Sequence, residues 1–543
     1  MRLNNSQDKK ELALLALFCS LYLIFTTFKI SLPGVHFDEV SGAIGAVDIL
    51  KKADSSFFLS ARLFNRLFPL MVQPYDGSLG SYILIPFFQV FGINTFSLRI
   101  APILFGLFTL LYTYFFTKEL FNQKAAIISI LLLSINPNYI LGSKIGNPSS
   151  YAVFFLMAAL FYLLKWHKTK RVFYFIIAVF LLGLGTSTIS WFLWVVVAFL
   201  ISGIIFHKDI GIKIREDKPN SFFSYCLWGI TFFCLGNFLL LWGNLSKNFL
   251  TLRYVCQHFC NTKHGINNLN FISNFIARMD TFIYFLNGRT IADEIFYKRP
   301  GNIIFPYLFI FIFSWLIFSL FFSKNMYFKK KRVAFVLVFF VSILIQSCFT
   351  LSGFRHCHLF VLITFIQVII AIGFVEITAN LRKNILQKFF SCFLFILFSL
   401  SVLFNLKILK NNYDDLIKTG GRGMWSDAIY QLAAWVRESK FKNFVAMDFG
   451  FSRNLYFLTR GEVDINDCQM SEETIYHDYL ERLSELLQDE NNMYIFHAQE
   501  FTLHKKGQTV FREIVERQGK QLIEEKMFYQ KDGSLIYIVY SAR

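Results

Sequence analysis

The chain has 543 residues, of which 55% are hydrophobic and 17% are charged. Soluble proteins carry about 45–50% apolar and about 25% charged residues, so the composition excludes a string of soluble domains and favours one lipid-embedded body. The net charge of +18 does not indicate a nucleic-acid partner, because most Lys and Arg residues form short clusters between apolar runs. We therefore expect a membrane protein that binds no nucleic acid.

The first apolar run, residues 12–30, follows Lys9 and Lys10. It is long enough to cross a membrane and no small-residue cleavage site follows it, so we interpret it as a retained helix, not a signal peptide. Eleven runs approach the roughly 20 apolar residues that a spanning helix needs. They are residues 11–32, 99–117, 125–142, 149–165, 172–187, 189–206, 221–243, 303–322, 333–352, 358–377 and 389–406.

The basic residues predict the orientation of these spans. With the amino terminus inside, the short outer loops contain almost no Lys or Arg apart from Lys144 and Arg355, in agreement with the positive-inside rule. Residues 172–206 must cross twice, because the basic clusters on both sides of them can be cytoplasmic only in that case. The inner clusters are at 2–10, 118–124, 165–171, 208–218, 324–332 and 382–388. The large outer segments are 33–98, 244–301 and everything from 407 onward.

The segment from residue 407 onward is charged and mixed in composition. Its patterns predict two helices, one capped by Ser426 and one behind Ser471, together with several strands. The expected helices are 425–438 and 472–489, and the expected strands are 444–447, 493–496 and 535–540. The predicted fold class is therefore a polytopic α-helical membrane protein with a transmembrane domain, 1–406, and a small extracytoplasmic α/β domain, 407–543.

Two adjacent carboxylates, Asp38 and Glu39, begin the first outer loop a few residues after the first span. Carboxylates at a membrane surface can bind a divalent metal ion or act as a general base. The alternative is a solvated pair that favours the start of a short helix along the membrane. In a helix the two side chains diverge, so one would face the acceptor and the other a metal ion or the scaffold.

Residues 36–121 resemble the start of the C-superfamily glycosyltransferases, in particular family 39, which groups protein O-mannosyltransferases and aminoarabinose transferases. The resemblance implies an enzyme that takes a sugar from a polyprenyl-phosphate donor on the outer side of a bacterial inner membrane and inverts the anomeric centre. It also implies that Asp38 is the general base and Glu39 its partner in a metal or acceptor site. The matching motifs are Phe37-Asp38-Glu39-Val40, Phe91-Gly92, Phe96-Ser97-Leu98-Arg99 and Thr117-Lys118-Glu119-Leu120-Phe121.

The chain departs from this family at one motif. Relatives often carry His-Pro-Pro where this chain has Gln73-Pro74-Tyr75, so no role of that histidine carries over. Asp76 follows directly, and we name it with His36 as a candidate support for the acceptor or a metal ion. The metal requirement, for which Asp38 and Glu39 are the candidate ligands, stays open.

The leaving group of such a transfer is a lipid phosphate, whose developing negative charge needs cations at the outer surface. Each candidate cation has an alternative role as an interfacial anchor that extends to lipid headgroups. The candidates on the expected outer side are Arg99, Lys144, and Arg355, His356 and His358 in one loop.

The second outer loop contains Cys256, His258, Cys260 and His264. Thiolates and imidazoles can bind zinc, but this spacing matches no standard zinc pattern. A disulfide or two free thiols are the plainer alternatives for Cys256 and Cys260.

Two other functions are alternatives to an enzyme. A transporter or flippase of lipid-linked sugars needs ionisable groups near the bilayer centre, and the expected spans have none there, since Glu376 lies at the cytoplasmic edge. A non-catalytic scaffold would tolerate loss of Asp38 and Glu39. We expect a glycosyltransferase whose partners are a polyprenyl-phosphate sugar donor and a lipid, glycan or protein acceptor.

Overall fold

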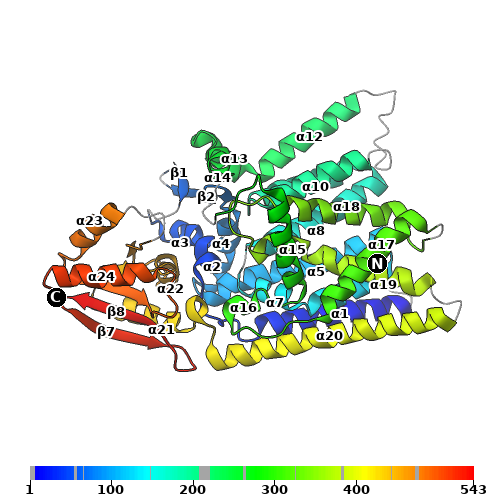
Figure 1. Cartoon of the computed structure of the whole chain (residues 1–543). Helices are drawn as coiled ribbons and strands as arrows, with labels where there is room; N and C mark the ends of the chain where they lie inside the picture. Colours follow the sequence, from blue (N-terminus) through cyan, green and yellow to red (C-terminus); the bar gives the residue numbers. More distant parts are fainter. Residues whose placement is uncertain are drawn as a thin grey trace.

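The computed structural model consists of a large helical body and a smaller α/β unit, which lies at the left of Figure 1. The predicted cluster at 208–218, His264 and Ser471 lie outside the part of the chain that the model describes. The described residues are 6–53, 58–64, 66–146, 148–206, 220–260, 265–323, 326–380, 385–441, 443–470 and 476–543.

Within these ranges, six helices are long and apolar enough to cross a membrane, and two bent helix pairs raise that number to as many as eight. These helices make the chain an integral membrane protein. The single helices are α1 (Ser6–Thr27), α5 (Thr95–Leu120), α8 (Ser149–Thr169), α17 (Ile304–Phe322), α19 (Ile363–Asn380), which follows the 3-10 helix η1 (His356–Leu362), and α20 (Ile385–Thr419). The bent pairs are α6 (Gln123–Ser134) with α7 (Pro137–Lys144), at 60°, and α12 (Asn220–Gly236) with α13 (Phe238–Ser246), at 78°.

The expected number of eleven spans is not confirmed, although every expected run contains a helix. Three runs form shorter helices, α9 (Val172–Thr186), α10 (Phe192–Ile205) and α18 (Lys330–Gln346), below the length of about 20 residues that a straight span needs. The run 125–142 bends at Pro137, which has no N–H to continue α6 and starts α7 under the Asn136 cap. The break predicted within 172–206 is confirmed.

The first expected outer loop folds into short elements that lie between the helical body and the C-terminal unit in Figure 1. The strands β1, β2 and β3 form a small antiparallel sheet. The elements of this loop are α2 (Phe37–Ser41), α3 (Ile44–Lys51), β1 (Leu59–Leu63), β2 (Arg66–Gln73), β3 (Asp76–Gly77) and α4 (Leu79–Phe91). The second loop contains α14 (Leu250–His258), α15 (Phe271–Leu286) and α16 (Ala292–Ile295).

The short helix α2 begins where the acidic pair predicts a helix start. The His36 ring accepts a hydrogen bond from the backbone N–H of Asp38, and the Glu39 carboxylate accepts one from the backbone N–H of His36. This reciprocal capping satisfies N–H groups that a helix start leaves without intrahelical partners.

The C-terminal unit is a five-stranded sheet in the order β5-β4-β6-β8-β7, with an apolar cluster on each face. Strands β4, β5 and β6 are parallel, and β8 is antiparallel to both of its neighbours. The strands are β4 (Asn443–Ala446), β5 (Ile465–Asp467), β6 (Asn492–His497), β7 (Leu522–Tyr529) and β8 (Leu535–Ala542). The helices are η2 (Gly423–Trp425), α21 (Ala428–Glu438), α22 (Ser452–Leu458), α23 (Tyr476–Leu486) and α24 (Lys505–Arg517).

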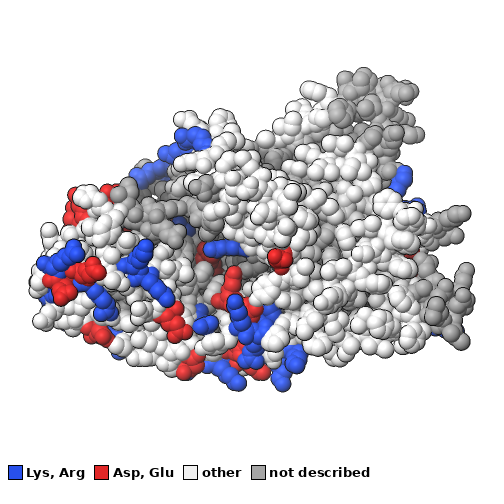
Figure 2. All heavy atoms as spheres, in the orientation of Figure 1, with Lys and Arg blue, Asp and Glu red and all other residues white. Residues whose placement is uncertain are grey.

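The three predicted strands and both predicted helices of this unit are present, with shifted boundaries. Helix α21 starts at Ala428, because residues 423–425 form a separate 3-10 turn. Ser426, the predicted cap, accepts a hydrogen bond from the Ala428 backbone N–H at 3.2 Å, whereas Asp427 at the N-cap position makes no side-chain cap bond. Helix α20 continues to Thr419, past residue 407, and its 35 residues measure about 50 Å. Figure 2 shows charged side chains gathered over this unit and the lower centre, whereas the helical body is largely uncharged.

Candidate functional site

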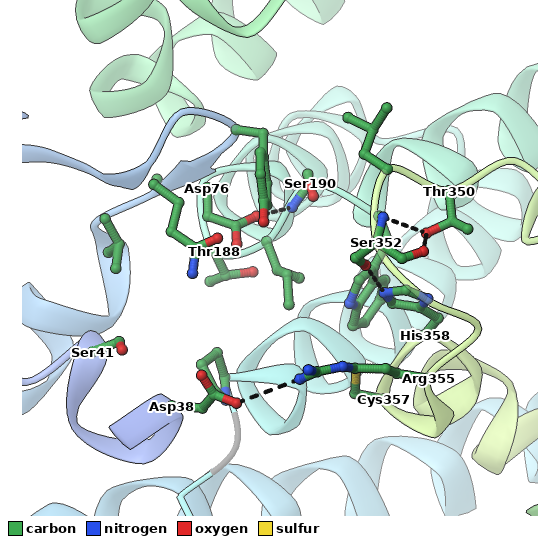
Figure 3. Close-up of a pocket in the computed structure, with 18 of the residues that line it drawn as sticks. Asp38, Ser41, Asp76, Thr188, Ser190, Thr350, Ser352, Arg355, Cys357 and His358 are labelled. Atoms are coloured by element: carbon green, nitrogen blue, oxygen red, sulfur yellow. Dashed lines mark hydrogen bonds and ion pairs between the residues drawn. The ribbon is translucent and has the colours of Figure 1, made fainter. Parts of the chain in front are cut away.

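A cavity of about 410 Å³ lies where α2, the β2–β3 turn, the α9–α10 break and the loop before η1 meet. Figure 3 shows its polar side chains converging from these four segments. Asp38, Glu39, Asp76, Arg355 and His358, which the sequence singled out, all line this cavity. The fold therefore joins residues that are far apart in the sequence.

Asp38 is the accessible carboxylate of the acidic pair. Its side chain is 54% exposed and its Oδ2 lies 3.8 Å from Arg355 Nη1, as Figure 3 shows. The same oxygen lies 3.8 Å from Nδ1 of His36. Burial lowers the pKa of His36, whose Nδ1 already accepts the Asp38 N–H, so the ring is a neutral acceptor there. Asp38 can thus take a proton from a ligand in the cavity.

Glu39 points away from Asp38 into the helical body, which confirms the predicted divergence. Its carboxylate accepts hydrogen bonds from Arg99 Nε at 2.6 Å and Arg99 Nη2 at 2.9 Å, and both side chains are 0% exposed. The Arg99 guanidinium also donates to the carbonyls of Ile30, Pro33 and Gly34. The predicted phosphate-binding role of Arg99 is therefore wrong, because protein oxygens surround its guanidinium.

The predicted metal site does not fit this geometry. A metal ion shared by Asp38 and Glu39 would need both carboxylates to converge, but Arg99 holds Glu39 in a bidentate pair on the scaffold side. Across the described ranges, no three or more His, Cys, Asp and Glu side chains are grouped as a metal ion would require. We assign no step to a metal ion.

Lys144, at the end of α7, is also held inside the protein. Its Nζ donates to the carbonyls of Thr26 and Phe28, and its side chain is buried. These carbonyls end α1, where the helix leaves C=O groups without intrahelical partners. The predicted contact of Lys144 with a donor phosphate is therefore wrong, and its ammonium group caps α1 instead.

The loop before η1 supplies the accessible cation of the cavity. The Arg355 side chain is 56% exposed and extends toward Asp38. His358 is buried, with Nδ1 3.4 Å from Arg278 Nη2 and Nε2 3.1 Å from Ser352 Oγ. The ring of His358 thus fixes the loop that presents Arg355. The side chain of His356 is not among the described ones.

Asp76 lies on the wall of the cavity away from Arg355 (Figure 3). Its Oδ1 accepts a hydrogen bond from the Ser190 backbone N–H at 2.7 Å, and burial raises the pKa of its carboxyl to about 6. The turn approaches the α9–α10 break so closely that a Cβ on Gly77 would lie 2.3 Å from the Ser187 carbonyl oxygen. This contact holds Asp76 at the cavity.

The sequence did not single out Glu294 on α16 or the aromatic side chains of the cavity. Trp425 stacks on His36 with ring centroids 4.3 Å apart and an interplanar angle of 12°. Aromatic residues make up 19% of the chain, so no local signal distinguished those of the cavity. The aromatic residues that line it are Tyr75, Tyr151, Trp191, Trp194, Phe259, Phe349 and Trp425.

The second-loop cysteines are both exposed and free, so no disulfide joins Cys256 and Cys260.

Comparison with known proteins identifies chains of similar sequence and fold. Residues 76–231 match the family model described as dolichyl-phosphate-mannose-protein mannosyltransferase. An uncharacterized protein of Aquifex aeolicus (strain VF5) is 28% identical over 102 residues, which are 19% of this chain and 20% of that relative. The sequence match thus covers about a fifth of the curated relative's length.

Two solved structures match most of the chain at low identity. ArnT from Cupriavidus metallidurans, bound to undecaprenyl phosphate, has a TM-score of 0.59 at 8% identity and covers 97% of both chains. The oligosaccharyltransferase AglB from Archaeoglobus fulgidus, in complex with an inhibitory peptide and a dolichol-phosphate, has a TM-score of 0.58 at 12% identity, covering 98% of this chain and 74% of that one. At the level of fold these matches agree with the resemblance: the chain has the fold of ArnT and AglB, and residues 76–231 match the mannosyltransferase family model.

Proposed function

We propose that this chain is a membrane glycosyltransferase that moves a sugar from a polyprenyl-phosphate donor to a hydroxyl of an acceptor, with inversion. The observation that carries the proposal is the opposition of Asp38 and Arg355 across one cavity, 3.8 Å apart and each about half exposed. The reaction needs a base for the acceptor and a cation for the leaving phosphate. These two side chains are an accessible base and an accessible cation of the cavity wall, and Glu294 on α16 is a second exposed carboxylate there.

In the proposed step, Asp38 removes the proton of the acceptor hydroxyl as its oxygen forms a bond to the anomeric carbon. The bond from that carbon to the phosphate oxygen breaks, and the phosphate leaves with the electron pair. Arg355 turns from Asp38 to the phosphate and stabilises its charge by charge-assisted hydrogen bonds. Both side chains have open surface, so substrates can separate them.

The other predicted cations have supporting roles in this proposal. Arg99 fixes Glu39 and thereby α2, Lys144 fixes the end of α1, and His358 fixes the loop of Arg355. Asp76 lines the cavity, where its carboxyl can hydrogen-bond an acceptor hydroxyl, and His36, whose Nδ1 lies 3.8 Å from Asp38 Oδ2, supports that carboxylate from outside the cavity lining. Solved proteins of this fold were captured with undecaprenyl phosphate and a dolichol-phosphate, which supports a polyprenyl-phosphate donor.

The cavity would face the outer side of the membrane, as the distribution of basic residues predicts, and the family resemblance favours a bacterial plasma membrane. The acceptor is a lipid, a glycan or a protein. Mass spectrometry of envelope lipids, glycans and proteins, with the gene deleted and then restored as wild type or as Asp38→Asn, tests the function. We expect one glycoconjugate to lose a sugar on deletion and to regain it only with the wild type. Unchanged glycoconjugates after deletion would contradict the proposal and favour a transporter or a scaffold.

A further inference from the structure

Helix α2, which carries Asp38, is too short to fix its own orientation. It has five residues, roughly one and a half turns, and isolated helices of fewer than about 12 residues are not stable in water. Its position must therefore come from the elements that contact it. The helical body supplies one anchor, the Arg99–Glu39 pair.

The second anchor comes from α22 of the C-terminal unit. Arg453 Nη1 donates a hydrogen bond to Ser41 Oγ at 2.9 Å, and its guanidinium lies over the Phe37 ring, 4.7 Å from the centroid. The Phe449 ring packs against Phe37 at 4.6 Å between centroids. Arg453 thus contacts the first and the last residue of α2, on either side of Asp38.

The same unit also holds the chain just before α2. Asn454 Nδ2 donates to the Val35 carbonyl at 2.9 Å, and the Gly34 N–H donates to the Trp425 carbonyl at 2.7 Å. The approach of Gly34 is so close that a Cβ there would lie 1.9 Å from the Ser426 carbonyl oxygen. Contacts of this density indicate a docked unit, in contrast to a domain on a free linker.

We propose that Arg453 of the C-terminal unit is a positioning residue for Asp38, which it holds toward the cavity by its hydrogen bond to Ser41 at one end of α2 and its cation–ring contact with Phe37 at the other. This inference rests on the proposed function of Asp38. A misplacement of about 1 Å in a reacting group can cost roughly a hundredfold in rate, so a side chain that never touches the substrate can control turnover. The C-terminal unit then contributes to the active site by positioning Asp38.

The test compares Arg453→Ala, Arg453→Lys and the control Arg437→Ala in the purified full-length chain. Arg437 lies in the same unit and forms an exposed pair with Glu462, 2.8 Å from Nε to Oε2, so its loss changes the charge equally without touching α2. With the polyprenyl-phosphate sugar that the wild type consumes, we expect Arg453→Ala to lower kcat about tenfold or more while the donor KM stays within about twofold. Arg453→Lys should recover part of kcat, and Arg437→Ala should match the wild type.

Hydrogen exchange of residues 35–43 gives a readout that needs no substrate. We expect faster exchange of this segment in Arg453→Ala than in Arg437→Ala. A wild-type kcat in Arg453→Ala, or unchanged exchange at α2, would overturn the inference. Failure of the proposed function would give a different result: Asp38→Asn would keep full turnover, or the wild type would transfer no sugar. In that case the exchange experiment would still decide whether Arg453 holds α2.

Discussion

Asp38 and Arg355 face each other across the cavity, with Oδ2 and Nη1 3.8 Å apart and about half of each side chain exposed. One residue follows the first span, and the other precedes the helix α19 near the end of the helical body. An ion pair with this exposure contributes at most about 1 kcal/mol to folding, so stability does not explain its placement. Its position in the cavity is better explained by function.

The exposed position of Arg355 predicts a loss of activity without a loss of fold. Arg355→Gln removes the cation that faces the leaving phosphate and should lower kcat/KM about a hundredfold, as expected for a lost charged donor at a developing anion. Arg355→Lys keeps the positive charge but lacks the planar guanidinium that donates two parallel hydrogen bonds. Its kcat/KM should therefore lie between those of Arg355→Gln and the wild type. Initial rates against donor concentration check this, and equal rates for Gln and wild type would show that the phosphate binds elsewhere.

The buried Arg99–Glu39 pair predicts the opposite pattern. Arg99→Ala leaves the Glu39 carboxylate without a charged partner at 0% exposure and should lower the free energy of unfolding by about 3–5 kcal/mol. Thermal unfolding in detergent measures the loss, and Arg437→Ala, which breaks an exposed pair, is the control with almost no change. Should Arg99→Ala melt like the wild type and only weaken donor binding, the phosphate role would return to Arg99.

Lys144 is expected to matter for stability in the same way. Lys144→Met keeps the length of the side chain but removes the donor to the carbonyls of Thr26 and Phe28. Leaving such buried acceptors unsatisfied costs about 1–3 kcal/mol. We therefore expect a lower melting temperature and an unchanged donor KM, and a raised KM at unchanged stability would contradict the assignment.

Arg99 and Lys144 show where prediction from the sequence ends. Hydropathy and charge placed Arg99 and Lys144 correctly at helix ends, and the acidic pair correctly predicted the start of α2. The direction of a long cationic side chain depends on its neighbours, and Arg99 finds its carboxylate in another element of the chain. No local pattern shows whether such a side chain extends to lipid, to a ligand or to the protein.

The C-terminal unit shows the same limit on a larger scale. Its strands follow from β-branched and aromatic runs, so β4, β6 and β8 were predictable. Its contacts with the segment that carries Asp38, such as the stack of Trp425 on His36 and the hydrogen bond from Arg453 to Ser41, were not. These contacts join segments that are distant in the sequence. They depend on where α20 places the C-terminal unit relative to the cavity.

Asp76 predicts a pH dependence of stability. Burial raises the pKa of its carboxyl in the folded chain from 3.8 to about 6, so the folded state binds the proton more tightly than the unfolded state. Between those values the wild type loses stability as pH rises, whereas Asp76→Asn, which keeps an oxygen for the Ser190 N–H, does not. We expect the variant to match the wild type near pH 4 and to be more stable by about 3 kcal/mol above pH 6. If the stability of the wild type and that of Asp76→Asn changed with pH in parallel across this range, the result would contradict a buried, proton-binding Asp76.

The central claim, that Asp38 is the base of a sugar transfer, is tested most directly by single-turnover transfer with Asp38→Asn in proteoliposomes. The substrate is the polyprenyl-phosphate sugar that the wild type consumes, and donor binding is measured on the same samples. Asparagine preserves the size of the side chain but cannot accept the proton, and loss of a general base costs about 10²–10⁴ in rate. We predict unchanged donor affinity and a transfer rate at least a hundredfold lower. Transfer at the wild-type rate would contradict the account.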